Sequence, residues 1–410
     1  YPFERTAATR GVEEAEVIEN IDIGGPTLIR AEAKNHAFSA VVVSPESYDA
    51  VLDELQSSDG RLSRQTRQAL ALDAFAYTAR YDTAIARWFA EREEEFPSLY
   101  VRAYEKVLDL SYGENPHQRA AYYAERGART HLLARSEQVH GKSLSFNNLL
   151  DLDAARNLLG EFQLPACVIV KHNNPCGVAV ASDVGTAYRR ARDCDPVSAY
   201  GGVIVVNRPV DGALGEELAG TFVEVLSAPG YDDAAMEALT RKPNTRIMLN
   251  LERRRANAGE RDMRRVVGGL LVQDRDAESE DRALMTVVTD RSPTEAEWGD
   301  LLFAWRVAKH VKSNAIVLAR DLVTVGIGAG QMSRVDSVRL SLEKAQSPVE
   351  GSVLASDAFF PFADGPEAAI SAGITAIIQP GGSIRDEEVF AAADRAGVAM
   401  VVTGRRHFRH

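Results

Sequence analysis

The sequence predicts an α/β fold, and three observations indicate it. Runs rich in valine and isoleucine at residues 168–170 and 316–318 are bounded by polar turn residues, as buried strands usually are. Stretches with apolar residues at three- and four-residue spacing, typical of amphipathic helices, fill much of residues 48–92. Glycine pairs follow further strand-like runs at 201–202 and 381–382. Strand-like runs that alternate with helical segments are characteristic of α/β proteins.

The composition narrows the class of protein. The 410 residues are enough for two or three domains, and no apolar run approaches the roughly 18 residues that span a bilayer. The net charge of −12 does not favour nucleic acid as a partner. Three unevenly spaced cysteines argue against a disulfide framework, so we expect a cytoplasmic protein. The chain starts at Tyr1 without the features of a signal peptide, and we interpret this start as a cut end.

The first element in chain order is predicted to be a βαβ unit. Residues 21–27 indicate a strand end, a glycine turn and a helix start, with Thr27 near the N-cap. The segment from Lys34 to His36 closes that helix, and residues 40–43 are predicted to form the next strand.

Helix-forming residues dominate the following segment as far as about residue 106, which predicts a helical connector. Its three expected helices cover residues 48–55, 62–79 and 83–92.

A second α/β region is expected from about residue 109 to the end. Within it, residues 166–173 and 314–321 are both strand-like runs that enter polar turns, and each is followed by another strand-like run. This similarity predicts a duplicated subdomain.

A polar turn, Lys171-His172-Asn173-Asn174-Pro175-Cys176-Gly177, follows the first of these strands. A rigid strand fixes the side chains that a loop exposes, so a base and two amides here predict an active site. An ordinary polar loop with a structural histidine is the alternative. Cys176 is conceivable as a nucleophile beside His172, but with no third catalytic group evident we prefer a small packed residue.

The glycine-rich segment Gly328-Ala329-Gly330 superficially suggests a dinucleotide-binding turn, but the third glycine of that pattern is missing. Arg334, just beyond it, is interpreted as a fixed cation for a phosphate, because a guanidinium fork matches phosphate oxygens. A surface arginine at a helix start is the alternative.

Zinc chemistry is not expected. Pro175-Cys176 is similar to the Pro-Cys of zinc nucleobase deaminases, yet Ala179 stands where their second cysteine should be, and Asn174 where a glutamate is required. The basic stretch that starts at residues 253–255 is interrupted by acidic residues, which favours a solvated face.

Further motifs occur in order along the chain, among them Asn20-Ile21-Asp22-Ile23-Gly24-Gly25, Ala33-Lys34-Asn35-His36, Tyr112-Gly113-Glu114-Asn115-Pro116-His117-Gln118, Lys312-Ser313-Asn314, Ser356-Asp357-Ala358-Phe359-Phe360-Pro361-Phe362 and Arg406-His407-Phe408. With the turn at Lys171 and the segment from Gly328 to Arg334, they resemble the bifunctional purine-biosynthesis family that combines phosphoribosylaminoimidazolecarboxamide formyltransferase with IMP cyclohydrolase. The resemblance covers essentially the whole chain.

The resemblance implies an architecture. Residues 109–410 would be a transferase region of two similar cytidine-deaminase-like α/β subdomains with a boundary at about 290–300. Residues 47–108 would be the helical connector. Residues 1–46 would be the C-terminal half of the cyclohydrolase domain, which is Rossmann-like (methylglyoxal-synthase-like), and the first half of that domain would be absent.

The resemblance also implies the reaction, which is formyl transfer from the co-substrate 10-formyltetrahydrofolate to the 5-amino group of 5-aminoimidazole-4-carboxamide ribotide, without a catalytic metal. His172 would remove a proton from the amine, Lys171 would stabilise charge on the formyl oxygen or assist the departing folate nitrogen, and Asn314 would lie beside the amine and carboxamide. The matching ribotide positions are Tyr112, Gly201, Glu224 and Arg334. The matching folate positions are Val335, Phe359, Asp364, Ser383, Ile384 and Arg406.

For ring closure, Lys34 matches the proton-transferring lysine of the family. The matching nucleotide positions are Tyr1, Asp22 and Ile23. A lysine that complements a helix dipole is the alternative for Lys34. We expect formyl transfer to be kept and ring closure to be lost or weakened.

The family also implies a homodimer whose transferase site is completed across the interface. Ser111 stands where the family usually has an arginine, so we expect weaker binding of the ribotide phosphate. The rival function from a different class is a catalytically inactive ribotide-binding module.

Overall fold

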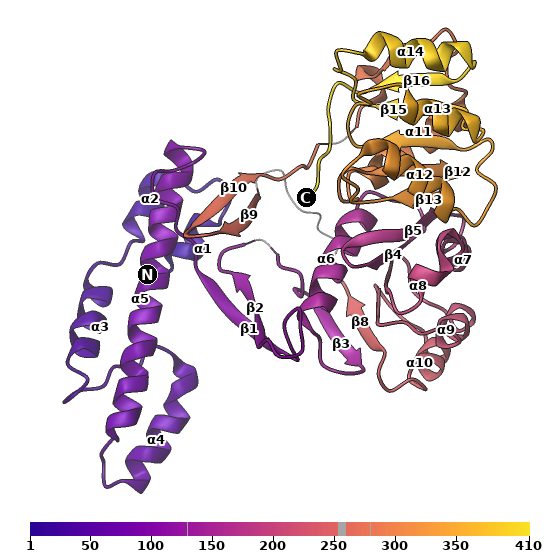
Figure 1. The fold of residues 1–410 in the computed structure, drawn as a ribbon. Coiled ribbons are helices and arrows are strands. Elements are labelled where there is room, and N and C mark those ends of the chain that lie inside the picture. The colour runs from indigo at the N-terminus through magenta and orange to yellow at the C-terminus, as the bar shows by residue number, and fades with distance from the viewer. Residues whose placement is uncertain (129, 253–259, 279) are drawn as a thin grey trace. The chain divides into compact units, whose positions relative to one another are not determined.

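Two units make up the computed structural model, which describes residues 1–128, 130–252, 260–278 and 280–410. The first unit contains Tyr1–Leu108 and Tyr122–His131, and the second contains Asp109–Ala121 and Leu132–His410 (Figure 1). The basic residues 253–255 lie outside the described residues.

The first unit is mainly helical, and its longest element is α5. The elements are α1 (Phe3–Ala7), α2 (Glu14–Glu19), α3 (Gly24–Lys34), η1 (Pro45–Ser47), α4 (Tyr48–Ser57), α5 (Arg64–Glu93), β1 (Tyr104–Leu110) and β2 (Ala120–Glu125), of which β1 and β2 form a two-stranded sheet. The prediction of two separate helices at 62–79 and 83–92 is wrong. Residues 80–82 contain no glycine or proline to stop a helix, so α5 runs through them for 30 residues.

The predicted βαβ unit is also wrong: only its helix forms, and no strand ends at residues 21–23. Residues 40–43 form no strand, because no other strand of the described residues lies beside them to complete a backbone ladder. Val41 and Val43 instead pack against a small cluster of alanines from α3 and α5. The helix begins at Gly24, so Thr27 lies inside it and donates its hydroxyl to the Ile23 carbonyl at 2.7 Å. The predicted end at Lys34 is confirmed.

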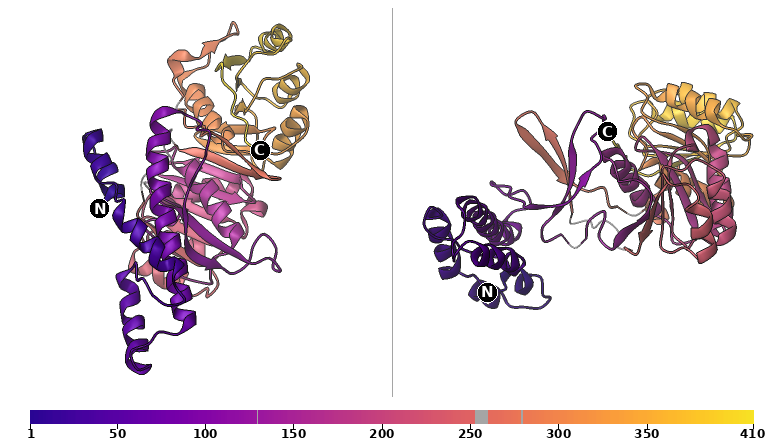
Figure 2. Two further views of the ribbon diagram at one scale, coloured as in Figure 1. Left: turned by 90° about the vertical axis from the view of Figure 1, so that its left-hand side faces the viewer. Right: turned by 90° about the horizontal axis from the view of Figure 1, so that it is seen from below.

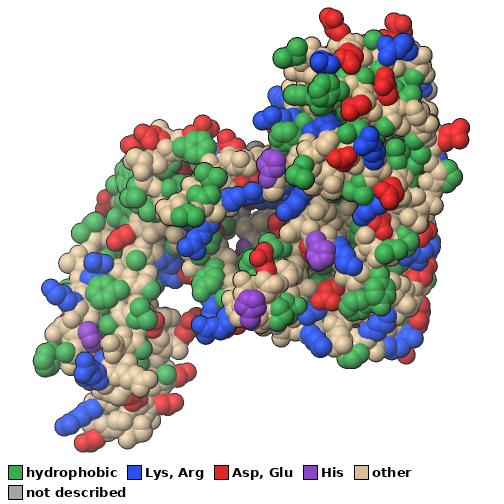
Figure 3. Space-filling view, in the orientation of Figure 1, with side chains coloured by type: hydrophobic (Ala, Val, Ile, Leu, Met, Phe, Trp, Pro, Cys, Tyr) green, Lys and Arg blue, Asp and Glu red, His purple; other side chains and the backbone are tan. Residues whose placement is uncertain are grey.

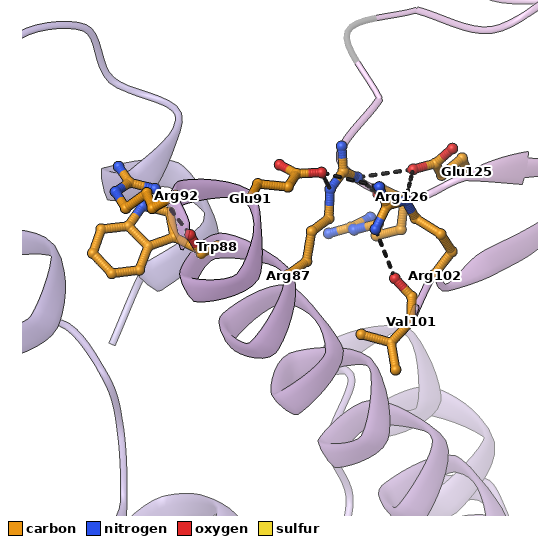
Figure 4. Close-up of polar contacts among 8 residues, drawn as sticks. All are labelled: Arg87, Trp88, Glu91, Arg92, Val101, Arg102, Glu125 and Arg126. Atoms are coloured by element: carbon orange, nitrogen blue, oxygen red, sulfur yellow. Dashed lines mark hydrogen bonds and ion pairs between the residues drawn. The ribbon is translucent and has the colours of Figure 1, made fainter. Parts of the chain in front are cut away.

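Charged side chains connect α5 to the two-stranded sheet (Figure 4). Arg87 pairs with Glu91 at 2.7 Å and with Glu125 at 2.9 Å, and Arg102 pairs with the same two carboxylates at 3.1 and 3.2 Å. The four side chains form a closed ring of opposite charges. The four side chains are 13–46% exposed, and ion pairs that solvent reaches typically contribute only about 0–1 kcal/mol each, so this ring mainly orients the strands.

The second unit is built on a mixed sheet of twelve strands in the order β11-β16-β15-β14-β12-β13-β5-β4-β6-β7-β8-β3, so the α/β prediction is confirmed. The strands of one half are β3 (Ser136–His140), β4 (Ala166–Lys171), β5 (Asn174–Val180), β6 (Val203–Val206), β7 (Val225–Ala228) and β8 (Arg246–Asn250). Those of the other half are β11 (Thr286–Val287), β12 (Ile316–Arg320), β13 (Val323–Gly328), β14 (Val353–Ser356), β15 (Ala376–Gln379) and β16 (Ala399–Val402). A separate ribbon consists of β9 (Arg261–Val266) and β10 (Gly269–Asp274), which pair antiparallel.

The strand order is the same when it is read outward from the centre in either direction. β5 and β13 pair antiparallel at the centre through Val323 and Ala179, each is joined to a hairpin partner, and parallel strands follow on both sides. The sheet therefore has two halves of equivalent connectivity, the first made of β3–β8 and the second of β11–β16.

Helices cover both faces of each half (Figure 2). In the first half, α6 (Phe146–Leu159) packs on β4 and β6. Side chains of a strand alternate between the two faces of the sheet. Cys167 and Ile169 of β4 pack in a hydrophobic core with residues of α7 and α9. In the second half, α11 (Glu295–Ala308) has the place of α6. The remaining helical elements are α7 (Val184–Cys194), α8 (Pro196–Ala199), α9 (Gly212–Ala219), α10 (Asp233–Leu239), η2 (Arg282–Leu284), α12 (Arg334–Lys344), α13 (Asp364–Ser371) and α14 (Asp386–Arg395).

No helix among the described residues has the length and apolar character needed to cross a membrane. On the face seen in Figure 3, Lys and Arg side chains are interspersed with Asp and Glu side chains, so this face does not form one continuous basic patch.

Candidate active site

Strand directions bring the predicted transferase residues to one edge of the sheet. Antiparallel pairing places the end of β4, with Lys171, beside the starts of β5 and β6. The same rule places the start of β12, after Asn314, beside the ends of β13 and β14. Because β5 and β13 are antiparallel, both groups lie at the same edge, where the parallel strands β14, β15 and β16 also end.

His172 and Asn173 form the two-residue turn between β4 and β5. Both have positive φ, 53° and 63°, and Lys171 pairs with Asn174 across the hairpin. An equivalent turn in the second half is made by Asp321 and Leu322, with φ of 55° and 58°. Turns of this type favour glycine, and a left-handed conformation costs other residues about 1–2 kcal/mol each.

A carboxylate from a helix holds each of these turns. Asp151 of α6 accepts a hydrogen bond from the Asn173 N–H at 2.6 Å and another from the His172 N–H. Burial raises the pKa of Asp151, and these two N–H groups oppose that shift. Asp300 of α11 accepts from the N–H groups of Asp321 and Leu322 at 2.9 and 2.7 Å. Hydrogen bonds to a charged group typically contribute about 1.5–3 kcal/mol, which offsets the strain of a turn without glycine.

Lys171 and His172 line a cavity of about 230 Å³ to which both halves of the sheet contribute. His172 is exposed, and the Lys171 ammonium donates to the Tyr200 carbonyl at 2.7 Å. Lys344 and Asp195, from opposite halves, also line the cavity and lie 3.6 Å apart. The first-half lining residues are Lys171, His172, Asn174, Pro175, Cys176, Cys194, Asp195 and Ser198, and the second-half ones are Gly326, Ile327, Ala329, Leu340 and Lys344.

Asn314 lies in a polar network with Arg334, the first residue of α12. The Arg334 guanidinium donates to the Asn314 side-chain oxygen at 2.7 Å and to the Ser356 hydroxyl at 2.8 Å, and it forms an ion pair with Asp357. The Asn314 amide nitrogen donates to the Gln331 carbonyl at 2.9 Å. Arg334 is 8% exposed and Asp357 is fully buried, so the surface alternative for Arg334 is wrong.

A single hydrogen bond connects this network to the turn. The side-chain oxygen of Asn174 accepts from the Lys312 N–H at 2.9 Å, two residues before Asn314. The His172 turn and the Asn314 segment are therefore fixed to each other, although they belong to different halves of the sheet.

Two of the predicted ribotide positions of the first half, Tyr112 and Glu224, are hydrogen-bonded to the first turn of α6. The Tyr112 carbonyl accepts from the Phe146 N–H at 3.1 Å, at the start of α6. Glu224 accepts from Asn148 of α6 at 3.3 Å and from Arg246 at 2.7 Å. Gly201 has φ of 73°, and an added Cβ would approach the Phe222 ring to 2.9 Å, so only glycine fits there.

The predicted folate positions follow the ends of β13, β14, β15 and β16 in the chain. Phe359 is 36% exposed and Ile384 is fully exposed, whereas the neighbouring Phe360 is buried in the core. Arg406 lies over the Phe408 ring at 4.5 Å, and the next residue along the chain, His407, donates its N–H to the Asp357 carbonyl at 2.9 Å. Val335 follows Arg334 in α12, Asp364 starts α13, and Ser383 lies in the loop after β15.

The predicted cyclohydrolase positions lie in the first unit. The amino group of Tyr1 lies 3.7 Å from the Asp22 carboxylate, which also accepts from the Gly25 N–H at 2.8 Å. Ile23 is exposed, and Lys34 is an exposed residue in the last turn of α3.

Cys176 has the environment of a packed residue. It is 9% exposed and donates to the Ile169 carbonyl at 3.5 Å. Burial raises the pKa of its thiol to about 12, so little thiolate forms near neutral pH, and this supports the preferred interpretation over a nucleophile. No group of three or more potential metal ligands converges within the described parts of the chain.

The sequence analysis missed two residues that organise the site, Asp151 and Asp357. A signal for Asp151 was present. α6 and α11 both start with a capping box, at Ser145 and Thr294, and carry an aspartate at the same helical position. Asp357 lies in a motif that the sequence analysis recognised, but its pairing with Arg334 joins different elements and could not be predicted from that motif.

A family comparison agrees with this arrangement. Residues 32–344 match the model of the AICARFT/IMPCHase bienzyme family. The chain belongs to this family. Over its whole length it is 51% identical to the bifunctional purine biosynthesis protein PurH of Roseobacter denitrificans, and 50% identical to those of Bacillus cereus and Bacillus anthracis. It covers 80% of each relative. The chain is thus an enzyme of purine biosynthesis, of the formyltransferase and cyclohydrolase type.

Proposed function

We propose that the second unit transfers a formyl group from 10-formyltetrahydrofolate to the 5-amino group of 5-aminoimidazole-4-carboxamide ribotide, with His172 as the base. The observation that carries this assignment is the hydrogen bond between Asn174 and the Lys312 N–H, because it fixes the turn of His172 beside the segment of Asn314. A base and an amide from distant parts of the chain are thereby held at one edge of the sheet, next to a cavity.

The amine of the ribotide needs such a base. Its lone pair is delocalised into the imidazole and carboxamide, so it attacks the formyl carbon effectively only if a proton is removed as the new bond forms. His172 is exposed at the cavity and takes that proton. The bond between the formyl carbon and folate N10 then breaks, and N10 leaves with a proton as tetrahydrofolate.

Lys171 provides the positive charge for this step. Its ammonium is anchored to the Tyr200 carbonyl, directly before Gly201, and has further N–H donors for the formyl oxygen or for the departing nitrogen. No metal is required in this scheme.

The ribotide and folate sets extend along the same edge. We assign Tyr112, Gly201 and Glu224 to the ribotide, with Asn314 beside its amine and carboxamide. We assign Arg334 to the ribotide as well, and its hydrogen bond to the Asn314 side chain also orients that amide. We assign the exposed side chains of Phe359 and Ile384 to the pterin, together with Val335, Asp364, Ser383 and Arg406 as the remaining folate positions.

The two halves of the sheet are proposed to be cytidine-deaminase-like subdomains of residues 109–410, and the boundary expected at about 290–300 is placed before β11, which pairs with β16 of the second half. The equivalent connectivity and the equivalent turns support this division. We assign residues 47–108 to a helical connector and 1–46 to the cyclohydrolase domain, with Lys34, Tyr1, Asp22 and Ile23 in its site. Ring closure by this chain is proposed to be weak, because Lys34, Tyr1 and Ile23 are all exposed.

A homodimer in the cytoplasm is the proposed state. The ribbon of β9 and β10 supports self-association, because its apolar side chains Val266, Val267, Leu270 and Leu271 are exposed.

The experiment incubates the purified chain with the ribotide and 10-formyltetrahydrofolate and identifies the product by mass. We expect the formamido intermediate to accumulate. IMP as the main product would show that ring closure is intact. If no product forms while the ribotide still binds, as measured by calorimetry, the chain is an inactive binding module and the proposal fails.

A further inference from the structure

We propose that Asp151 is a positioning residue for formyl transfer, because its carboxylate holds the backbone of the turn that presents His172. This inference rests on the proposed function of His172, and it assigns a task to a residue outside the turn and outside both substrate sets. Asp151 touches the backbone of the catalytic segment and reaches the reaction only through it.

The geometry of the turn makes such a device necessary. His172 and Asn173 both adopt left-handed backbone conformations without glycine at either position. Two-residue hairpin turns of this kind favour Asn-Gly, and side chains with a Cβ leave this conformation readily unless surrounding groups hold it. Asp151 supplies that hold through the N–H groups of His172 and Asn173.

The hold matters because it decides where the imidazole lies. The direction of the His172 side chain is set by the φ and ψ of a residue with no strand neighbour of its own. A misplacement of a catalytic group by about 1 Å can cost about 100-fold in rate. Asp151 comes from α6, a helix packed on β4 and β6, so the reference point is rigid.

The second half of the sheet contains a matched control. Asp300 of α11 is hydrogen-bonded to the N–H groups of Asp321 and Leu322, and the two aspartates precede their turns by equal numbers of residues. The turn at Asp321 lies at the opposite edge of the sheet, where no residue has been assigned to the reaction. Any effect on catalysis that comes only from loosening a hairpin should therefore be shared by Asp151 and Asp300 variants.

The test compares Asp151→Asn and Asp300→Asn in the full chain. Each change keeps the size of the side chain and removes the negative charge that accepts the backbone N–H groups of the turn. We expect Asp151→Asn to lower kcat about 10- to 100-fold, with the KM of both substrates changed less than about threefold. Asp300→Asn should leave kcat within about twofold of the wild-type value.

Two further measurements separate positioning from general destabilisation. Hydrogen exchange should become faster in a peptide containing residues 172–173 in Asp151→Asn only, and in one containing residues 321–322 in Asp300→Asn only. In the double variant Asp151→Asn with His172→Ala, kcat should equal that of His172→Ala alone, because Asp151 acts through His172.

The proposal is overturned if Asp151→Asn keeps the wild-type kcat, or if Asp151→Asn and Asp300→Asn lower kcat equally. It is also overturned if the fold-losses in kcat of Asp151→Asn and His172→Ala multiply in the double variant. It is also overturned if exchange at residues 172–173 does not change. A wild-type chain without formyl transfer would instead reject the proposed function of His172, and the exchange comparison would still decide whether Asp151 holds the turn.

Discussion

The two halves of the twelve-stranded sheet have the same connectivity but place different chemistry at corresponding points. The turn held by Asp151 carries His172 at its first position, whereas the turn held by Asp300 carries Asp321 there. α7 of the first half starts at Val184 after a conventional aspartate cap, and α12 of the second half starts at the buried Arg334. An aspartate that supports the turn is therefore common to both halves, while the proposed base His172 is present only in the first.

The largest effect is expected at the two turns themselves. His172→Ala should lower kcat for formyl transfer by about 10²- to 10⁴-fold, which is the usual contribution of a positioned general base. Asp321→Ala, a change at the same turn position in the other half, should leave kcat unchanged. The measurement is the initial rate of tetrahydrofolate release. Equal losses in both variants would mean that the turns matter only for folding.

The second effect concerns the buried arginine at the start of α12. Arg334→Ala should lower the free energy of unfolding by about 3–5 kcal/mol, because it leaves the fully buried Asp357 without its ion-pair partner. Arg339→Ala, on the exposed face of the same helix, should change it by less than about 0.5 kcal/mol. Urea denaturation measures both. A small loss for Arg334→Ala would mean that Asp357 is neutral or paired otherwise.

A smaller effect is expected from the position before Tyr112, where the first half carries a neutral residue. Ser111 is exposed, and its hydroxyl donates to the Leu144 carbonyl at 3.1 Å. Ser111→Arg restores a cation for the ribotide phosphate and should lower the KM for the ribotide about tenfold, near the lower end of the 1.5–3 kcal/mol of a charge-assisted hydrogen bond. Steady-state kinetics at fixed folate measures it, with Ser111→Gln as the neutral control of similar length. Equal KM values for wild type and Ser111→Arg would reject a phosphate contact here.

The smallest effect is expected at the contact between the halves. The His310 ring after α11 is hydrogen-bonded to the Glu161 carboxylate after α6 at 3.0 Å. Burial lowers the pKa of His310, although the carboxylate opposes this shift. The unfolded chain therefore binds a proton at a pH where the folded chain does not. This contribution to stability is present above the usual pKa of histidine and is lost as the pH falls through it.

The thermal midpoint should accordingly fall on acidification through pH 6.5, and it should fall less in His310→Asn. The exposed His117→Asn is the control and should behave like the wild type. A wild-type midpoint that rises on acidification would mean that the protonated pair with Glu161 is the stable form.

The sequence by itself determined most of the local elements and the family, and it predicted which groups react. Valine and isoleucine at residues 168–170 predict β4 because β-branched side chains pack well on a pleated surface, and the polar residues that follow predict its turn. The periodic apolar residues of α5 predict helix. The predicted break at residues 80–82 does not occur, because the helix continues through them. The ordered motifs were specific enough to predict the family.

The tertiary structure alone decided how these groups meet. Residues 40–43 have the composition of a strand but no partner strand among the described residues, because strand formation depends on hydrogen bonds to a neighbour. Arginine side chains are usually exposed, yet Arg334 at the start of α12 is buried against Asp357, which follows β14. Asp151 holds a turn that lies far ahead in the chain, because α6 packs on β4. Such contacts depend on the direction and packing of whole elements, which a linear pattern of residues does not contain.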